Sequence, residues 1–189
     1  MFKGERVSLR PIKRADVPLF LKWFNDPEVT QYLALYLPLT EMAEDKWIEE
    51  STSTRANTDV GFVIEATNKE VPQAIGSIGL HKLNQKDREA TLGIAIGEKE
   101  YWGKGYGYES VRLIVRFGFE QMNLHRISSS AYSFNERSLN LHRKVGFVKE
   151  GVRRKAAFKN GQYWDMIEFG MLEIEWKSLA INTLKEFKT

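Results

Sequence analysis

Alternating apolar and polar positions mark the strands of this chain. A stretch in which every second residue is apolar is typical of a half-buried strand, and turn residues bound each such stretch here. The expected strands are 6–12, 59–67, 74–84, 88–97 and 125–133, with two more that flank the turn at Asn160-Gly161 and reach about Leu172. The stretches 59–67 and 74–84 are close enough in the sequence to predict a hairpin.

Apolar residues at helical spacing separate these strands. Phe20 and Trp23 lie on one face of a helix expected at 16–26. Further helices are expected at 40–52, 108–123, 135–146 and 173–187. In the segment 135–146, Asn135 at the start is an N-cap signal and Gly146 at the end is a C-cap signal.

The order of these elements predicts one α/β domain that covers residues 1–189. One strand and two helices precede a three-strand meander, which is followed by a helix, a strand, a helix and a closing hairpin. No repeat, low-complexity segment or linker interrupts this order. A chain of 189 residues can bury about two-thirds of its unfolded surface, so its core needs no disulfide or metal for stability.

Composition and charge exclude several kinds of site. The absence of cysteine excludes disulfides, thiolate metal sites and a cysteine nucleophile, and the three scattered histidines predict no metal site. The net charge is only +3, and 25 acidic residues are interleaved with the basic ones, so no nucleic-acid partner is expected. No segment has the roughly 20 apolar residues that span a bilayer, and the N-terminus lacks a signal sequence. We therefore expect a cytoplasmic protein with no membrane partner.

The segment YWGKGYGYES, residues 101–110, places three glycines between a buried strand and a helix. Main-chain N–H groups at a helix N-terminus bind phosphate, and glycine lets a ligand approach them closely. The segment is not a Walker loop, because no Ser or Thr follows Lys104. A dinucleotide fingerprint fails as well, because its third glycine position is occupied by Tyr108 or Ser110. A tight turn that binds nothing is the alternative.

Three stretches together resemble the GNAT superfamily of acetyl-CoA-dependent N-acetyltransferases. They are EYWGKGYGYES (100–110), SFNERSLNLHRKVGFVKEG (133–151) and NGQYWDMIEFGMLEIEW (160–176). Within the superfamily, the chain is similar to the ribosomal-protein N-acetyltransferase branch of the RimJ/RimL type, which includes polyamine acetyltransferase relatives. The resemblance implies a central mixed, mostly antiparallel sheet flanked by helices. Strands four and five of that sheet would splay apart and admit the pantetheine arm of coenzyme A.

The resemblance also implies where acetyl-CoA, the expected cosubstrate, would bind. Its pyrophosphate would contact the main chain of Trp102, Gly103, Lys104, Gly105, Tyr106 and Gly107, and its pantetheine that of Ile94, Ala95 and Ile96. Asn135 and Ser138 would lie beside coenzyme A, and a helix cap is the alternative role for them. Trp102 stands where the family pattern usually has Gln or Arg, a difference that leaves main-chain contacts unchanged.

The catalytic residues depart from the family pattern. In the segment LHRKVGF, His142 stands where the family commonly places a tyrosine that protonates the leaving thiolate. Imidazolium is an adequate donor to a thiolate with a pKa of about 8.5, so His142 is the candidate acid, and an ordinary helix residue is the alternative. Many relatives carry Ala-Glu where this chain has Ala90-Thr91, so a usual carboxylate is missing. Glu28 and Asp165 are candidates to receive a cationic acceptor amine.

We expect the chain to transfer acetyl to a protein N-terminal α-amine. Such an amine has a pKa of about 8, against about 10.4 for an alkyl-amine, and is easier to deprotonate. A polyamine or another small-molecule amine is one alternative acceptor. A non-catalytic acyl-CoA-binding module is another possibility, because the usual tyrosine and glutamate are both missing. The branch also suggests a homodimer, and His81 and His125 are expected to be strand residues without a catalytic role.

Overall fold

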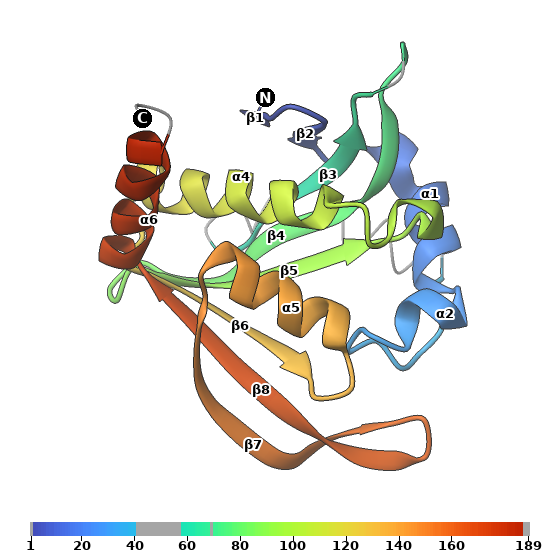
Figure 1. The fold of residues 1–189 in the computed structure, drawn as a ribbon. Helices are drawn as coiled ribbons and strands as arrows, with labels where there is room; N and C mark the ends of the chain where they lie inside the picture. The colour runs from blue at the N-terminus through green and yellow to red at the C-terminus, as the bar shows by residue number, and fades with distance from the viewer. Residues whose placement is uncertain (1, 41–57, 69, 187–189) are drawn as a thin grey trace.

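The structure is a computed structural model that describes residues 2–40, 58–68 and 70–186. One sheet of eight strands forms its centre, in the order β1-β2-β3-β4-β5-β6-β8-β7 (Figure 1). The strands are β1 (Phe2–Lys3), β2 (Val7–Pro11), β3 (Val60–Ala66), β4 (Gln73–Asn84), β5 (Glu89–Ile96), β6 (Arg126–Tyr132), β7 (Val148–Lys159) and β8 (Gln162–Leu172). Among these strands only β5 and β6 pair in parallel. The predicted mixed, mostly antiparallel sheet is confirmed.

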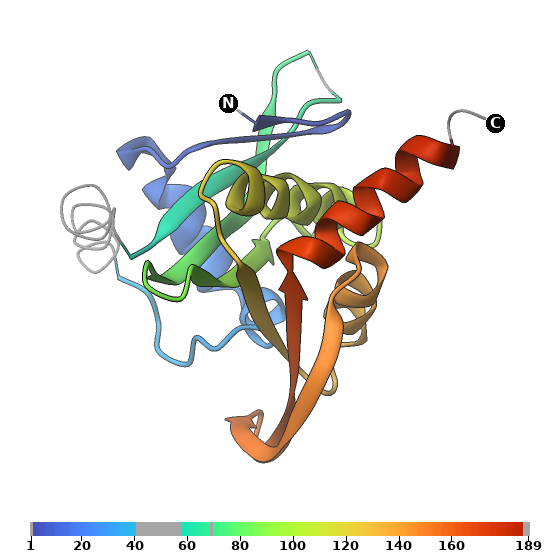
Figure 2. The same cartoon turned by 90° about the vertical axis from the view of Figure 1, so that its left-hand side faces the viewer.

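Helices cover both faces of the sheet. They are α1 (Val17–Phe24), α2 (Pro27–Thr30), α4 (Tyr106–Glu120), α5 (Glu136–Val145) and α6 (Glu173–Glu186), with 3-10 turns η1 (Arg14–Asp16) and η3 (Lys99–Tyr101). Helix α4 crosses β2, β4 and β5 on one face, and α5 lies beside it. Figure 2 shows α1 on the opposite side of the sheet.

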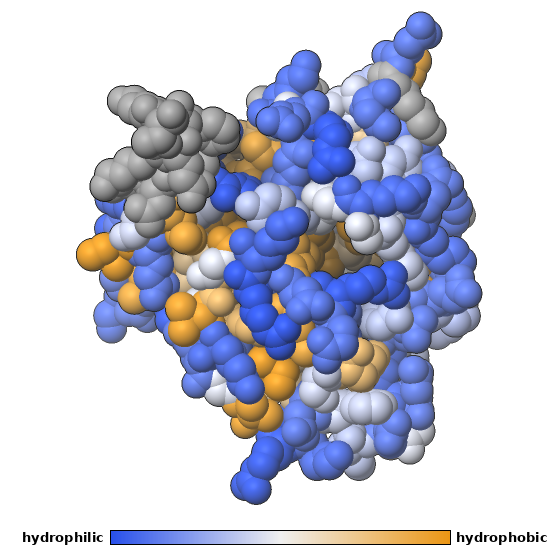
Figure 3. Space-filling view, viewed as in Figure 1, coloured by the Kyte–Doolittle hydropathy of each residue, from blue (hydrophilic) through white to orange (hydrophobic). Residues whose placement is uncertain are grey.

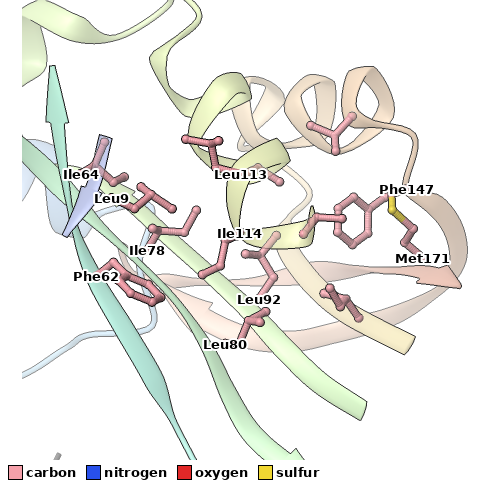
Figure 4. Close-up of a cluster of buried hydrophobic side chains, with 14 of the residues drawn as sticks. Leu9, Phe62, Ile64, Ile78, Leu80, Leu92, Leu113, Ile114, Phe147 and Met171 are labelled. Carbon is pink, nitrogen blue, oxygen red and sulfur yellow. The ribbon is translucent and has the colours of Figure 1, made fainter. Parts of the chain in front are cut away.

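The sheet supplies a core on each face because its side chains alternate. Figure 4 shows side chains between α4 and the sheet, among them Leu9, Ile64, Ile78, Leu80, Leu92, Leu113 and Ile114. Val63, which follows Phe62 in β3, points the other way and packs against Phe20 and Trp23 of α1. Two apolar layers therefore hold the sheet between α4 and α1.

The parallel pair β5–β6 is short. Its register partners are Glu89 with Arg126, Ala90 with Ile127 and Thr91 with Ser128. Beyond Thr91 the two strands separate, and β6, β8 and β7 turn away from the rest of the sheet (Figure 1). We call the space between the second halves of β5 and β6 the wedge. The splay expected between strands four and five is confirmed, and these are β5 and β6 here because β1 precedes them.

The predicted elements agree closely with the observed ones. The five strands expected before residue 134 each lie within one residue of their expected bounds. Helix α4 begins two residues earlier than expected, at Tyr106, and the predicted helix at 40–52 lies outside the described residues except for Thr40. The sequence analysis missed β1 and α2, because a two-residue strand and a one-turn helix are too short to show a hydrophobic period.

We predict that Gly97→Ala destabilises the fold by about 1–3 kcal/mol, the usual cost of overpacking a core. A Cβ on buried Gly97 would overlap the indole ring of Trp23, which is itself only 1% exposed. Urea unfolding of the variant and the wild type measures the difference. Gly151→Ala is the control, because its Cβ meets nothing within 4 Å. Equal losses in the two variants would contradict the packing argument.

Candidate active site

The edge of β5 offers main-chain groups to the wedge. The N–H of Gly97 donates to the Ile75 carbonyl at 2.8 Å, so Gly97 turns toward β4. Because successive residues of a strand direct their N–H and C=O to opposite edges, Ile94 and Ile96 direct theirs into the wedge. The indole Nε1 of Trp102 donates to the Ile96 carbonyl at 2.7 Å. Ile94 thus presents an N–H and a C=O to the wedge, and Ile96 presents an N–H.

Ala95 does not share this geometry. By the same alternation, its N–H and C=O point to β4, where Ser77 is its register partner. The prediction that the main chain from Ile94 to Ile96 binds pantetheine therefore needs a correction at Ala95. Its side chain lies on the face of the sheet away from α4, where a second cavity begins.

The glycine segment forms a turn that starts α4. Gly103 and Gly105 have φ angles of 71° and 90°, a left-handed conformation that glycine adopts without strain. Gly105 is the N-cap of α4, so the free N–H groups of the first helical turn face the open end of the wedge. Gly107 lies within that first turn, and a Cβ there would have ordinary contacts with Leu141 and Ile94. The positive end of the helix dipole adds to these donors.

A cavity of about 620 Å³ occupies the wedge and continues to the glycine turn. In Figure 3 it corresponds to a hollow between α4 and α5 with apolar surface at its bottom. Ten of the predicted site residues line it: Ile94, Ala95, Ile96, Trp102, Gly103, Gly105, Gly107, Asn135, Ser138 and His142. We call this space the wedge cavity.

Two of the residues predicted to bind coenzyme A do not line the wedge cavity. Lys104 is exposed, and its carbonyl accepts a hydrogen bond from Arg6 Nη1 at 3.2 Å. Tyr106 is buried, and its ring meets that of Tyr101 edge-on at 4.9 Å between centroids. Only the main-chain groups of Lys104 and Tyr106, and not their side chains, would contact a ligand bound at the predicted loop.

Two cations that the sequence analysis did not single out line the wedge cavity. The guanidinium of Arg137 lies 4.2 Å from the ring centroid of Trp102, and its Nη2 donates to the hydroxyl of Tyr32 at 3.0 Å. Lys144 lies 4.8 Å from the ring centroid of Tyr108. Together with the N-terminus of α4, they make this part of the cavity suitable for an anion. Arg137 belongs to the NERS motif, so the sequence contained an indication of this cavity residue.

Asn135 and Ser138 connect the wedge cavity to the start of α5. The side-chain oxygen of Asn135 accepts a hydrogen bond from the Ser138 N–H at 3.1 Å, so the expected helix cap is confirmed. Both residues also line the wedge cavity, and a contact with coenzyme A stays a prediction for them.

His142 is buried and held on both ring nitrogens. Nδ1 lies 2.7 Å from the Ser138 carbonyl, which can only accept, so Nδ1 carries the proton. Burial lowers the pKa of His142 below its ordinary value, and the bond to Ser138 opposes this only in part. In the resulting neutral ring, Nε2 is an acceptor 2.8 Å from the Ser129 hydroxyl, whose one proton faces both Nε2 and the Leu92 carbonyl. The ring also stacks on Phe169, with centroids 4.6 Å apart.

This arrangement argues against the imidazolium acid that the sequence suggested. A neutral ring with its one N–H bonded to Ser138 has no proton to give a thiolate. Ser129 lies at the point where β5 and β6 separate. Its hydroxyl oxygen is 2.8 Å from His142 Nε2 and 3.2 Å from the Leu92 carbonyl oxygen. The geometry supports a positioning role for His142, which holds Ser129 and thereby the closed end of the wedge.

The two predicted acceptor acids lie outside both cavities that we describe. Glu28 is exposed on α2 and forms an ion pair with Lys99, which also bonds Asp26 at 2.9 Å. Asp165 accepts a hydrogen bond from the Lys155 N–H at 2.9 Å and so holds the irregular part of the β7–β8 hairpin. Neither carboxylate is placed to receive a substrate amine, which corrects the expectation for both.

A second cavity of about 460 Å³ lies on the face of the sheet opposite α4. Its described lining is largely apolar and comes from α1, from the segment that follows α2 and from the middle of β3, β4 and β5. Leu33, Gly93, Ile94 and Ala95 line both cavities, so the two meet at β5. We call it the apolar cavity.

Among the described residues there is neither a metal-binding cluster nor a membrane-spanning helix. No three of their His, Asp and Glu side chains come together in a way that could hold a metal ion. Their helices are all too short or too polar to cross a bilayer.

Comparisons with known proteins agree with this architecture. Residues 6–148 match the profile of the acetyltransferase (GNAT) domain family. The chain is 30% identical over 174 residues to the SPbeta prophage-derived uncharacterized N-acetyltransferase YokL of Bacillus subtilis, covering 92% of this chain and 94% of that protein. It is 28% identical over 180 residues to spermidine N(1)-acetyltransferase of Escherichia coli, covering 93% and 91%.

A solved structure has the same fold. Spermidine N-acetyltransferase of Vibrio cholerae, in complex with CoA and spermine, superposes with a TM-score of 0.84 and 24% identity. The match covers 92% of this chain and 99% of the other.

We predict that His142→Gln weakens the dependence of stability on pH in the weakly acidic range. A lowered folded-state pKa means that the unfolded chain binds the proton more readily, so His142 favours the folded state above its ordinary pKa of about 6.5. That contribution is lost as the pH falls toward the folded-state value. Urea unfolding between pH 7.5 and pH 5 should therefore give a steeper loss for the wild type than for the variant, and parallel curves would contradict this account.

Proposed function

The chain belongs to the acetyltransferase (GNAT) domain family and is an N-acetyltransferase, and we propose that it moves the acetyl group of acetyl-CoA to the primary amine of a small molecule. One observation carries this proposal. The pairing of β5 with β6 stops at Thr91 and Ser128, and the opening leads from the free edge of β5 to the N-terminus of α4. A long ligand with an amide-bearing arm and a phosphate end fits these two features in that order.

Coenzyme A would be held by main-chain and cationic groups. The N–H groups at the start of α4 would bind its pyrophosphate, as free donors at a helix N-terminus do. Arg137 and Lys144, on the α5 side of the wedge cavity, would lie near its phosphates. The N–H groups of Ile94 and Ile96 and the carbonyl of Ile94 would bind the amides of the pantetheine arm.

The acetyl group would lie against β5, at the closed end of the wedge. Attack of an amine on the thioester carbonyl places negative charge on its oxygen, and a fixed N–H donor stabilises that charge. An N–H of β5 that faces the wedge and is not bonded to the pantetheine arm would fill this role. The acceptor amine would approach from the apolar cavity, which meets the wedge cavity at Gly93 and Ile94.

Two acceptor classes compete. A small-molecule amine is supported by the 28% identical spermidine N(1)-acetyltransferase, whose similarity extends over 93% of this chain. The protein N-terminal α-amine expected from the RimJ/RimL resemblance stays the second candidate, supported by its lower pKa.

Release of free thiol from acetyl-CoA tests the function. We expect the wild-type protein to turn over small primary amines with kcat/KM at least tenfold higher than N-terminal peptides of matched pKa. Mass spectrometry of the acetylated amine identifies the product. Preference for the peptides would favour the second candidate. Binding of coenzyme A by calorimetry without turnover of any amine would instead indicate a non-catalytic acyl-CoA-binding module.

We predict that Arg137→Gln weakens coenzyme A binding about tenfold, or about 1.4 kcal/mol. The variant removes a positive charge beside Trp102 in the wedge cavity. Pantetheine, which lacks the phosphates, should bind the variant and the wild type equally in a calorimetric titration. Arg143→Gln, on the same helix but outside the cavity lining, is the matched control and should bind coenzyme A as the wild type does. An equal loss for both ligands would mean that Arg137 acts through structure rather than charge.

A further inference from the structure

Three glycines lie side by side across three neighbouring strands. Gly61 of β3 is the register partner of Gly79 of β4, and Gly79 is the partner of Gly93 of β5. All three line the apolar cavity, on the face of the sheet opposite α4. Because glycine has no side chain, this row forms a main-chain floor on which neighbouring side chains lie closely, and a Cβ on Gly61 would be 3.1 Å from Ile12 Cδ1.

The imidazole of His81 lies at the β4–β5 end of this floor. A Cβ on Gly79 would lie 2.7 Å from His81 Nε2, and a Cβ on Gly93 would lie 3.3 Å from the same atom. The ring therefore occupies the space above both glycines, and a larger residue at either position would displace it. Gly93 lines both cavities, and His81 lines the apolar cavity beside it.

Asp59 orients this imidazole. Its Oδ1 lies 3.1 Å from His81 Nδ1 and also accepts the Lys82 N–H at 3.2 Å, while Oδ2 accepts the Thr58 hydroxyl at 3.0 Å. A carboxylate can only accept, so Nδ1 carries a proton, and in the neutral form of the ring the lone pair is on Nε2. A base whose far nitrogen is held by a carboxylate, with its near nitrogen open to a cavity, is the arrangement that a proton-abstracting histidine requires.

We propose that His81 is the catalytic base of the acetyl transfer and that its substrate is a primary amine on an apolar body. The proposal rests on the proposed function, because it assumes that the thioester lies against β5. It also accounts for Ala90-Thr91, where the carboxylate usual in relatives is missing. Thr91 is the register partner of His81, so the imidazole stands directly across from that position.

The proton transfers balance without a further reactant. An acceptor that arrives as an ammonium ion gives one proton to His81 Nε2 and becomes a neutral amine. Its lone pair forms the N–C bond to the acetyl carbon, and the C–S bond breaks with its electrons on sulfur. The nitrogen then loses a second proton, which the thiolate takes up. His81 returns its proton to water, so the products are the amide, the free thiol of coenzyme A and one proton.

The lining of the apolar cavity sets the acceptor class. Ile12, Phe20, Phe24, Leu33, Leu35 and Leu39 form its walls. Apart from His81, no ionisable side chain belongs to that lining within the described ranges. In this described lining a second ammonium group, as in a polyamine, would find no carboxylate partner, and a buried charge without a partner is costly. An aromatic or branched apolar group would instead lie against these apolar walls.

Two variants and one control test the base. We expect His81→Ala and His81→Gln to lower kcat by roughly 10²-fold, the low end for a positioned base, with coenzyme A affinity unchanged. Added imidazole should restore part of the activity of His81→Ala, because it can enter the vacated space, and it should not affect the wild type. His125→Gln, at an exposed histidine outside both cavity linings, should keep wild-type kcat.

Substrate preference tests the acceptor class. We expect 2-phenylethylamine to be acetylated with kcat/KM at least tenfold above spermidine at the same pH. The reverse preference would overturn the apolar acceptor. If the wild type acetylates amines and both His81 variants keep kcat within twofold, His81 is not the base although the proposed function stands. If the wild type acetylates no amine while it binds coenzyme A, the proposed function fails and the inference falls with it.

Discussion

The early end of the β5–β6 pairing is the constraint on which the site depends. After three register pairs, Ser129 of β6 meets the Leu92 carbonyl through its side-chain oxygen, and main-chain pairing does not continue. His142 holds that serine from the other side. A sheet that continued to pair would satisfy its own edge and leave no main-chain groups for a ligand. The unpaired edge therefore persists because buried side chains keep the two strands apart.

Strand β5 lines two cavities because two things alternate along a strand. Its main-chain groups alternate between the two edges, and its side chains alternate between the two faces. The N–H and C=O groups of β5 alternate between its edges, which gives the wedge the main-chain groups of Ile94 and Ile96. Its side chains alternate between the faces of the sheet, which places Gly93 in the apolar cavity beside the imidazole of His81. Donor and acceptor can thus meet at β5 although they approach from different sides of the sheet.

Local signals in the sequence predicted most of the fold. Period-two stretches placed the strands, Asn135 and Gly146 marked the ends of α5, and the glycine segment marked the turn before α4. Contacts between distant residues were not predictable in the same way. Trp23 covers Gly97, and Asp59 orients His81 from 22 residues away. His142 occupied the expected position, but its burial and its bond to Ser129 depend on packing that no local pattern describes. The RimJ/RimL branch, the homodimer and the cytoplasmic location stay predictions.

The bond from Trp102 to the Ile96 carbonyl limits what the edge of β5 can offer a ligand. That carbonyl is occupied by the protein itself, so the edge presents the N–H groups of Ile94 and Ile96 and, between them, one free acceptor, the Ile94 carbonyl. Donor, acceptor and donor read the same from either end, so this row sets the register of an amide-bearing arm and leaves its direction open. The direction has to come from the two ends of the wedge, which differ, because the N-terminus of α4 lies at one end and the paired part of β5 and β6 at the other.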